Sequence, residues 1–234
     1  MVRKAGSGGP TGPGGVPHAA EDHRRVVKFP AVAAGILLGG LVFVCAAPSS
    51  PRAESAAPAP AAVIDALDQT LVGVMKDALK LGYQGRYAAL EPIIERTFNI
   101  KLMTQLVVGP AWAGWTQGQR DQVSDAFRRF ITATYARRFD GYSGEDFVID
   151  GERESPNGTV VTTRLIRPSD PAITINYLIR DNGEGAARVV DVYLTGTISE
   201  LATRRSEFSA VLEHDGFAGL LAALDKKAGS PPVP

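Results

Sequence analysis

The chain has 234 residues, of which 44% are hydrophobic, and its 25 Lys and Arg side chains balance 25 Asp and Glu side chains. The lack of a basic excess argues against a nucleic-acid partner bound through bulk charge, and the apolar content argues against a disordered chain. A single Cys and three His leave no material for a disulfide framework or a zinc site. We therefore expect no metal, no cofactor and no nucleic acid.

The first 47 residues have the pattern of an export leader. Residues 1–20 are rich in Gly, Pro and Ala, which is typical of disorder. Residues 23–28 then supply three basic side chains ahead of an uncharged, mostly apolar segment at residues 29–47. This pattern predicts a secretory signal cleaved after Ala46. The apolar segment is also long enough to cross a bilayer as a helix, so an uncleaved membrane anchor is the alternative.

Composition divides the remaining chain into three parts. Residues 48–62 are rich in Pro, Ala and Ser, which predicts an extended linker. Residues 63–228 have the apolar periodicities of a folded domain, and residues 229–234 form a short Pro-rich tail.

The domain begins with predicted helices. Apolar residues recur at helical spacing from residue 63 to residue 78, and Gly82 is expected to end that helix. A second helix follows Arg86, with Pro92 expected in its first turn, where proline is tolerated.

Two further helices are predicted before the pattern changes. Residues 99–108 form a short apolar piece closed by Gly109 and Pro110. The sequence Thr-Gln-Gly-Gln from Thr116 is a capping box that opens a helix over residues 117–135.

The chain then changes to the period of strands. Residues 145–149, 158–167, 172–180 and 187–195 alternate or carry dense β-branched side chains. Asn157-Gly158 and Asp181-Asn182-Gly183 are the turn signals between them.

A second capping box is expected at Thr197, opening a helix that stops near Gly216 and is followed by a short final helix. The order of helices, a four-stranded antiparallel sheet and helices predicts an α+β fold. The domain has one histidine, His214, and the helix dipole explains a histidine at a helix end. An apolar-lined binding module fits these residues better than an enzyme does.

The motifs follow one another in the order VVGPAW (107–112), TQGQR (116–120), FRRF (127–130), FDGYSGE (139–145) and VDVYLTGTIS (190–199). Over residues 65–227 this order resembles the MlaC family, also called the toluene-tolerance auxiliary component of ABC transporters. The stretches GYQGRY (82–87) and TISELATRRSEF (197–208) are most similar to the hopanoid-associated HpnM branch.

The resemblance implies a periplasmic lipid carrier with no catalytic residues. Its expected partners are a lipid, either hopanoid or phospholipid, an inner-membrane ABC lipid transporter complex and an outer-membrane lipoprotein complex. The implied fold is a curved antiparallel sheet of the NTF2-like kind packed by helices. An uncleaved leader would instead anchor the domain to the inner membrane, facing the periplasm.

We expect the lipid to bind between the sheet and the helix at residues 123–135. The candidate cavity residues are Leu106, Trp112, Phe127, Phe130, Tyr135, Ile173, Ile175, Tyr177, Ile179, Val190, Val192 and Leu194.

Two alternatives use the same fold. One is a non-catalytic interaction module. The other is a ketosteroid-isomerase-like enzyme, in which Asp191 with Tyr177 or Tyr193 would supply a neutral carboxyl and a hydroxyl donor. Alternation predicts that Val190 and Val192 share one face of the sheet and Asp191 the other, so the position of Asp191 separates the enzyme from the carrier.

Overall fold

The computed structural model describes residues 58–183 and 185–229. The expected leader, residues 48–57 of the expected linker and residues 230–234 of the expected tail lie outside this part of the chain. Within it, no helix combines the length and the apolar character needed to cross a bilayer.

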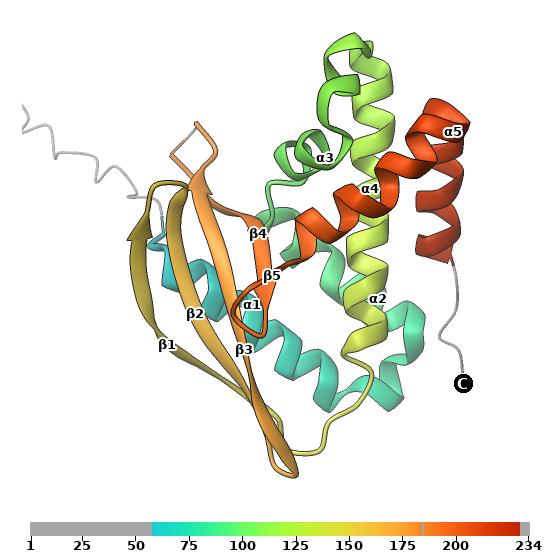
Figure 1. Cartoon of the computed structure of the whole chain (residues 1–234). Helices are drawn as coiled ribbons and strands as arrows, with labels where there is room; N and C mark the ends of the chain where they lie inside the picture. The colour runs from blue at the N-terminus through green and yellow to red at the C-terminus, as the bar shows by residue number, and fades with distance from the viewer. Residues whose placement is uncertain (1–57, 184, 230–234) are drawn as a thin grey trace, which may run out of the picture. The chain divides into compact units, whose positions relative to one another are not determined.

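Helices occupy the first half of the described chain, and they lie on one side of the sheet (Figure 1). They are α1 (Pro60–Lys76), α2 (Ala78–Thr97), α3 (Ile100–Val108), the 3-10 helix η1 (Gly109–Gly114) and α4 (Gln117–Arg138).

The junction of α1 and α2 differs from the expectation. Helix α1 ends at Lys76, earlier than expected, but Gly82 does end a helical run: with φ of 59° and ψ of −176° it is not helical and divides α2 into two helical parts. Glycine tolerates this positive φ better than other residues do. Pro92 consequently lies inside α2 and not in a first turn.

The capping box at the start of α4 is confirmed. The Thr116 hydroxyl accepts a hydrogen bond from the Gln119 amide at 3.2 Å, and the Gln119 side chain accepts one from the Thr116 amide at 2.9 Å. Each bond satisfies an amide that the helix itself leaves without a partner.

Replacing Thr116 by Ala is expected to lower the free energy of unfolding by about 1 kcal/mol, because the Gln119 amide in the first turn of α4 loses its acceptor. Urea unfolding followed by circular dichroism measures the change. Thr70→Ala is the matched control, since the Thr70 hydroxyl bonds to the Ala66 carbonyl within helix α1 and caps no helix end. Equal effects of the two substitutions would contradict the capping role.

The second half of the chain forms an antiparallel sheet in which each strand pairs with the next along the chain. The strands are β1 (Asp146–Ser155), β2 (Gly158–Arg167), β3 (Asp170–Asp181), β4 (Ala187–Leu194) and the two-residue β5 (Ile198–Ser199). The α+β architecture is confirmed, with a short fifth strand added to the four expected.

The turn predicted at Asn157-Gly158 joins β1 to β2. Gly158 has φ of 126°, and a Cβ atom there would lie 2.3 Å from the Ile179 carbonyl oxygen of β3. The turn therefore requires glycine both for its conformation and for this close approach.

A β-bulge in β4 overturns the expected alternation. Leu178 pairs with Asp191 and Ile179 with Val189, so two residues of β3 face three of β4. As a result Val190 packs with Leu178 on one face, whereas Val192 joins the main core on the other. The prediction that Val190 and Val192 share a face was wrong, because it assumed an uninterrupted strand.

Helix α5 (Glu200–Gly229) ends the described chain. Gly216, with φ of 64° and ψ of −158°, is not helical and divides α5 into two helical parts, so the expected end of a helix near Gly216 and the final helix after it are confirmed. The N-cap of α5 is Ser199, whose hydroxyl accepts a hydrogen bond from the Ala202 amide at 2.9 Å, and not Thr197.

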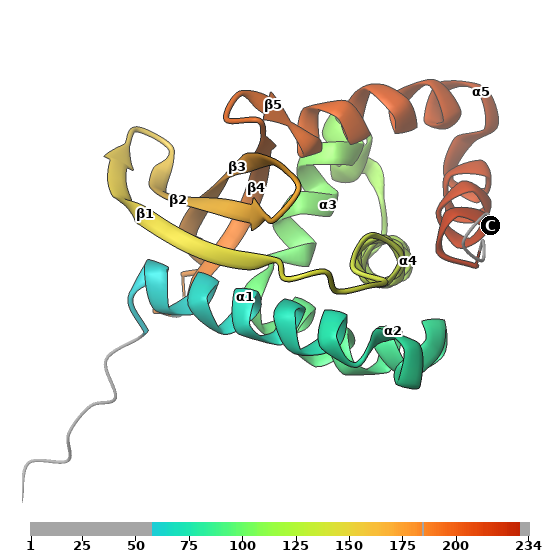
Figure 2. The same cartoon turned by 90° about the horizontal axis from the view of Figure 1, so that it is seen from below.

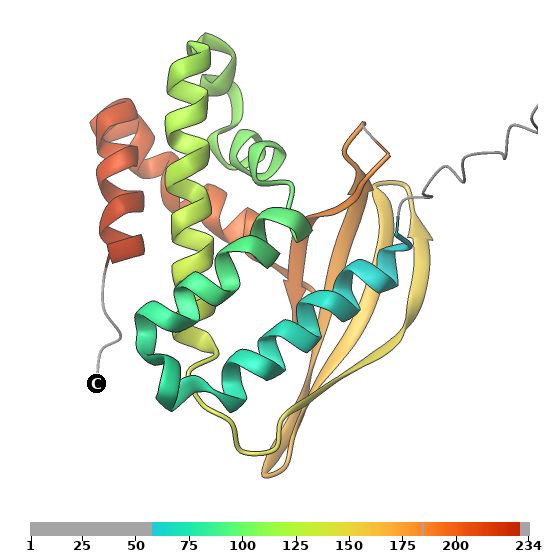
Figure 3. The ribbon, with the colours of Figure 1, turned by 180° about the vertical axis from the view of Figure 1, so that it is seen from behind.

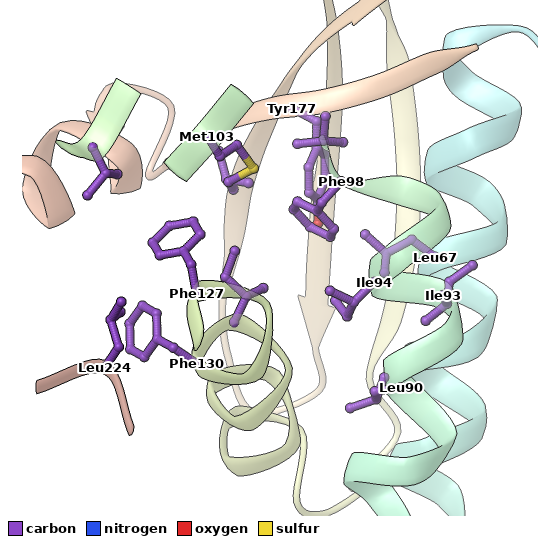
Figure 4. Close-up of a cluster of buried hydrophobic side chains, with 14 of the residues drawn as sticks. Leu67, Leu90, Ile93, Ile94, Phe98, Met103, Phe127, Phe130, Tyr177 and Leu224 are labelled. Atoms are coloured by element: carbon purple, nitrogen blue, oxygen red, sulfur yellow. The ribbon is translucent and has the colours of Figure 1, made fainter. Parts of the chain in front are cut away.

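The helices enclose the core together with one face of the sheet. Figure 2 looks along α4 and shows it between α2 and α5, while α1 lies across the sheet (Figure 3). Phe127 and Phe130 project from α4 toward Met103 and Leu224, and Tyr177 points from β3 toward Phe98 (Figure 4). This arrangement places α4 against the strands that carry the site.

Candidate lipid-binding site

A cavity of about 90 Å³ lies between the sheet, α4 and the start of α5. Most of its lining is apolar or aromatic. It comprises Phe98, Met103, Phe127, Phe130, Ile131, Thr134, Tyr135, Phe139, Ile175, Tyr177, Val192, Leu194 and Leu201, with Arg138, Asp191, Glu200 and Arg204 as the charged members.

Local periodicity explains the two main walls. Phe127, Phe130 and Thr134 recur at three- and four-residue steps and so lie on one face of α4. Ile175 and Tyr177 are two residues apart in β3 and point to the same side of the sheet.

Charged side chains stand where the start of α5 meets the end of α4. The Arg204 guanidinium lies 3.1 Å from the Glu200 carboxylate and 2.9 Å from that of Glu207, and Arg138 lies 3.7 Å from Glu200. Arg204 also lies over the Phe130 ring, 5.3 Å from its centroid. These partly exposed ion pairs contribute little stability, about 1 kcal/mol or less each, so this cavity rim can separate at small cost.

Burial opposes ionisation of Glu207, but hydrogen bonds from Lys227 and Arg204 outweigh it and lower the pKa of this carboxyl. Glu207 therefore stays ionised at neutral pH.

The interior of the cavity carries two phenol hydroxyl groups. Burial raises the pKa of Tyr135 and of Tyr177 well above the ordinary value, so both phenols remain protonated. Within the described part of the chain, no His or Cys lines the cavity. Across residues 58–183 and 185–229, no three His, Cys, Asp or Glu side chains gather closely enough to hold a metal ion.

Comparison with known protein families shows to which family this chain belongs. The model of the MlaC protein family matches residues 65–226, well over half of the chain. The chain belongs to the MlaC family. Members of this family are periplasmic lipid-binding proteins, generally without catalytic activity.

A solved structure of similar fold is that of the phospholipid-binding protein from Ralstonia solanacearum in complex with a phospholipid. The two chains superpose with a TM-score of 0.64 and share 19% sequence identity, and the match covers 73% of this chain and 97% of the other. At this identity the likeness shows the fold, which is that of the MlaC family.

The structure brings seven of the twelve candidate residues of this MlaC-family chain together at the cavity: Phe127, Phe130, Tyr135, Ile175, Tyr177, Val192 and Leu194. The other five lie elsewhere. Trp112 packs against Trp115 and under the Arg120 guanidinium, and Leu106 is 37% exposed on α3.

Three of the candidate residues that lie on strands are also outside the cavity lining. Ile173 lies against the core beyond the cavity lining, and Ile179 is buried within the core. Val190 faces the opposite side of the sheet because of the bulge in β4.

Two lining residues came from a segment that local patterns did not single out. Phe98 forms an isolated parallel bridge with Val189, and the Asn99 amide donates a hydrogen bond to the Val189 carbonyl at 2.9 Å. This contact between distant segments carries Phe98, and Met103 just after it, to the cavity. No spacing within residues 98–103 signals the contact of Phe98 with Val189, 91 residues later in the chain.

Asp191 accepts three hydrogen bonds, two from backbone amides and one from a hydroxyl. Its Oδ1 accepts hydrogen bonds from the amides of Val192 at 2.8 Å and Leu201 at 3.1 Å, and its Oδ2 accepts one from the Ser199 hydroxyl at 2.7 Å. A carboxylate occupied by three donors at the start of α5 fixes that helix end. Asp191 also lines the cavity, which is the position that the enzyme alternative required. Its oxygens are occupied by these three donors, which favours a structural role over a catalytic one.

Replacing Asp191 by Ala is expected to lower the free energy of unfolding by about 2–3 kcal/mol, because the Ser199 hydroxyl and the Leu201 amide lose a charged acceptor. Hydrogen exchange at Leu201 should accelerate in parallel. Asp191→Asn, which keeps one acceptor oxygen, should cost less. A change below about 0.5 kcal/mol for Ala would contradict the capping role.

Proposed function

We propose that this chain is a periplasmic lipid carrier that works with an inner-membrane ABC lipid transporter complex. It moves hopanoid or phospholipid between the inner and outer membranes, where an outer-membrane lipoprotein complex is the second partner. The observation that carries the proposal is the apolar cavity between α4 and the sheet in a chain of the MlaC family.

The energetics of transfer explain why such a carrier needs a cavity and no catalytic group. Exposing a chain of about 16 methylenes to water costs about 13 kcal/mol, at about 0.8 kcal/mol for each methylene. Aromatic and aliphatic walls such as Phe127, Ile175 and Val192 offset this cost while the lipid crosses an aqueous compartment.

The cavity must widen before it holds a lipid. Its volume is about 90 Å³, whereas pockets for small organic ligands enclose about 300–1,000 Å³. We infer that the rim side chains move apart, because partly exposed ion pairs hold Arg138, Glu200 and Arg204 there. In contrast, the hydrogen bond from the Leu201 amide to Asp191 holds the backbone at the start of α5. The later part of α5 stays in place, since Phe208, Leu220 and Leu224 are fully buried.

Uptake from vesicles tests the carrier function directly. The full chain is incubated with phospholipid vesicles, separated from them by sedimentation and examined by native mass spectrometry. The carrier predicts a species heavier by one lipid. Protein that stays empty after incubation, and that carries no lipid when purified from membranes, would refute the proposal.

Two observations bear on which lipid the carrier prefers. The phospholipid in the Ralstonia solanacearum protein supports a phospholipid cargo, whereas the HpnM-like stretches at residues 82–87 and 197–208 support a hopanoid. A rigid ring system loses less conformational entropy on capture than two flexible acyl chains do. We propose that hopanoid is preferred.

Competition distinguishes the two lipids. Protein loaded with labelled phospholipid is mixed with detergent-free vesicles that contain excess hopanoid, and the label that remains bound is counted. Hopanoid preference predicts that most of the label is displaced. Unchanged phospholipid occupancy would show that phospholipid is the cargo.

A further inference from the structure

A second depression lies between α1 and β1, apart from the lipid cavity. It encloses about 480 Å³, and its lining includes Val72, Gly73, Phe147 and Ile149 as apolar members. The rings of Tyr135, Phe139 and Phe147 form a continuous row, with centroids 5.7 and 6.2 Å apart, that connects the cavity wall to this α1–β1 groove. No residue lines both sites.

Asp68 is the unusual residue of the groove. It lies on the buried face of α1 and is 4% exposed, yet neither carboxyl oxygen has a hydrogen-bond partner among the described residues. Buried polar groups in folded proteins are nearly always paired, and one that is not calls for an explanation. Asp68 is among the residues that line the groove. Its carboxyl oxygens are shielded from solvent, so a partner in the groove reaches them only when the side chains over them shift.

The surroundings of Asp68 are acidic. Asp65 of α1 and Asp146 of β1 line the same groove, and together with burial, which is the largest cause, they raise the pKa of Asp68 to about 8. On α4 and β3, the phenols of Tyr135 and Tyr177 interact electrostatically with Asp68, and both carry no charge at neutral pH.

The one basic side chain of the groove does not neutralise Asp68. The Lys76 ammonium lies over the ring of Tyr142, 5.3 Å from its centroid. Gln69 is also engaged, since its amide donates a hydrogen bond to Asp65 at 2.7 Å. The groove therefore presents acceptors, negative potential and apolar walls without a matching cation.

We propose that the α1–β1 groove binds a primary ammonium group attached to an apolar body, with Asp68 as the charged partner of the ammonium. An ammonium supplies hydrogen-bond donors to the Asp68 carboxylate and the positive counter-charge that the groove does not provide. Val72, Phe147 and Ile149 contact the apolar part. The ammonium can belong to an aminolipid headgroup or to a free alkylamine, and both present the same chemistry to the groove.

Binding at this site is linked to ionisation. The empty protein holds Asp68 protonated at neutral pH, so a bound ammonium must displace that proton. Affinity should consequently rise with pH by up to about tenfold per unit below the pKa of Asp68 and level off above it. A protein in which Asp68 has been replaced has no such group, and its residual binding should not follow this profile.

Calorimetric titration of the full chain with decylamine tests the site, with decanol as the uncharged probe of equal chain length. We expect decylamine to bind at least about tenfold more tightly than decanol, and Asp68→Asn to remove that advantage. Gly73→Leu should also abolish binding, because open space lies over Gly73 and a leucine there fills the groove without backbone clash. Asp121→Asn, the same substitution on the exposed surface of α4, is the control.

Two further readouts complete the test. Ile175→Trp, which fills the lipid cavity, should leave decylamine binding intact, since the groove is a separate site. Stronger binding to phosphatidylethanolamine vesicles than to phosphatidylcholine vesicles would assign the ammonium to a headgroup, and equal binding would assign it to a free amine. Equal affinity for decylamine and decanol, or an unchanged affinity in Asp68→Asn, would overturn the proposal.

Discussion

The full chain carrying Ile175→Trp is expected to lose lipid uptake by at least about tenfold, because the loss of even two methylene contacts is worth more than 1.4 kcal/mol. Ile175 is 6% exposed and lines the cavity from the centre of β3. An indole ring there occupies space that the lipid needs. Native mass spectrometry after incubation with vesicles measures the bound lipid.

The matched control is Ile173→Trp. Ile173 lies two residues earlier on the same face of β3 but outside the cavity lining, so the same added volume should leave uptake close to wild type. Urea unfolding checks that both variants remain folded. Full lipid uptake by a folded Ile175→Trp protein would contradict the placement of the lipid.

The second large effect concerns stability. Asp68→Leu is expected to raise the free energy of unfolding at pH 8.5 by about 3–5 kcal/mol. The pKa of Asp68 is raised from 3.8 to about 8 in the folded chain, and each pKa unit corresponds to about 1.4 kcal/mol. Leucine needs no hydrogen-bond partner and keeps the apolar face of α1 intact.

The pH dependence has a definite sign. Below about pH 4 both folded and unfolded chains hold the Asp68 proton, so this group has no effect on stability. Between about pH 4 and pH 8 the unfolded chain releases the proton while the folded chain keeps it, and the free energy of unfolding falls as pH rises. Above that range the full penalty remains.

Urea unfolding of wild type and Asp68→Leu at several pH values measures this difference. The gap between the two proteins should widen from pH 4 to pH 8 and then stay constant. A gap that does not depend on pH would mean that Asp68 ionises normally in the folded chain.

Regular periodicity made part of the site predictable. The spacing of Phe127, Phe130 and Tyr135 places them on one face of a helix, and the alternation of Ile175 and Tyr177 places them on one face of a strand. These five residues line the cavity, because each pattern continues without interruption through an element that the structure confirms.

The other site residues could not be placed from the sequence, because the structural features that position them leave no local pattern. The bulge in β4 turned Val190 away from the core, since one extra residue reverses the faces of a strand. Phe98 reached the cavity through its bridge to Val189 across the fold.

Asp68 did leave a signal in the sequence. It stands one turn from Ile64 and Leu71 on the apolar face of α1, where a carboxylate breaks the expected pattern. Burying a charged residue within an apolar stripe costs free energy, so its presence there calls for an explanation.

The most direct measurement of the central claim is photo-crosslinking with a phospholipid that carries a diazirine in its acyl chain. The full chain takes up this lipid from vesicles, is irradiated, and is mapped by mass spectrometry. A lipid held between α4 and the sheet predicts adducts at Phe127, Ile175 and Val192. Adducts confined to Leu178 and Val190, on the opposite face of the same strands, would contradict the account.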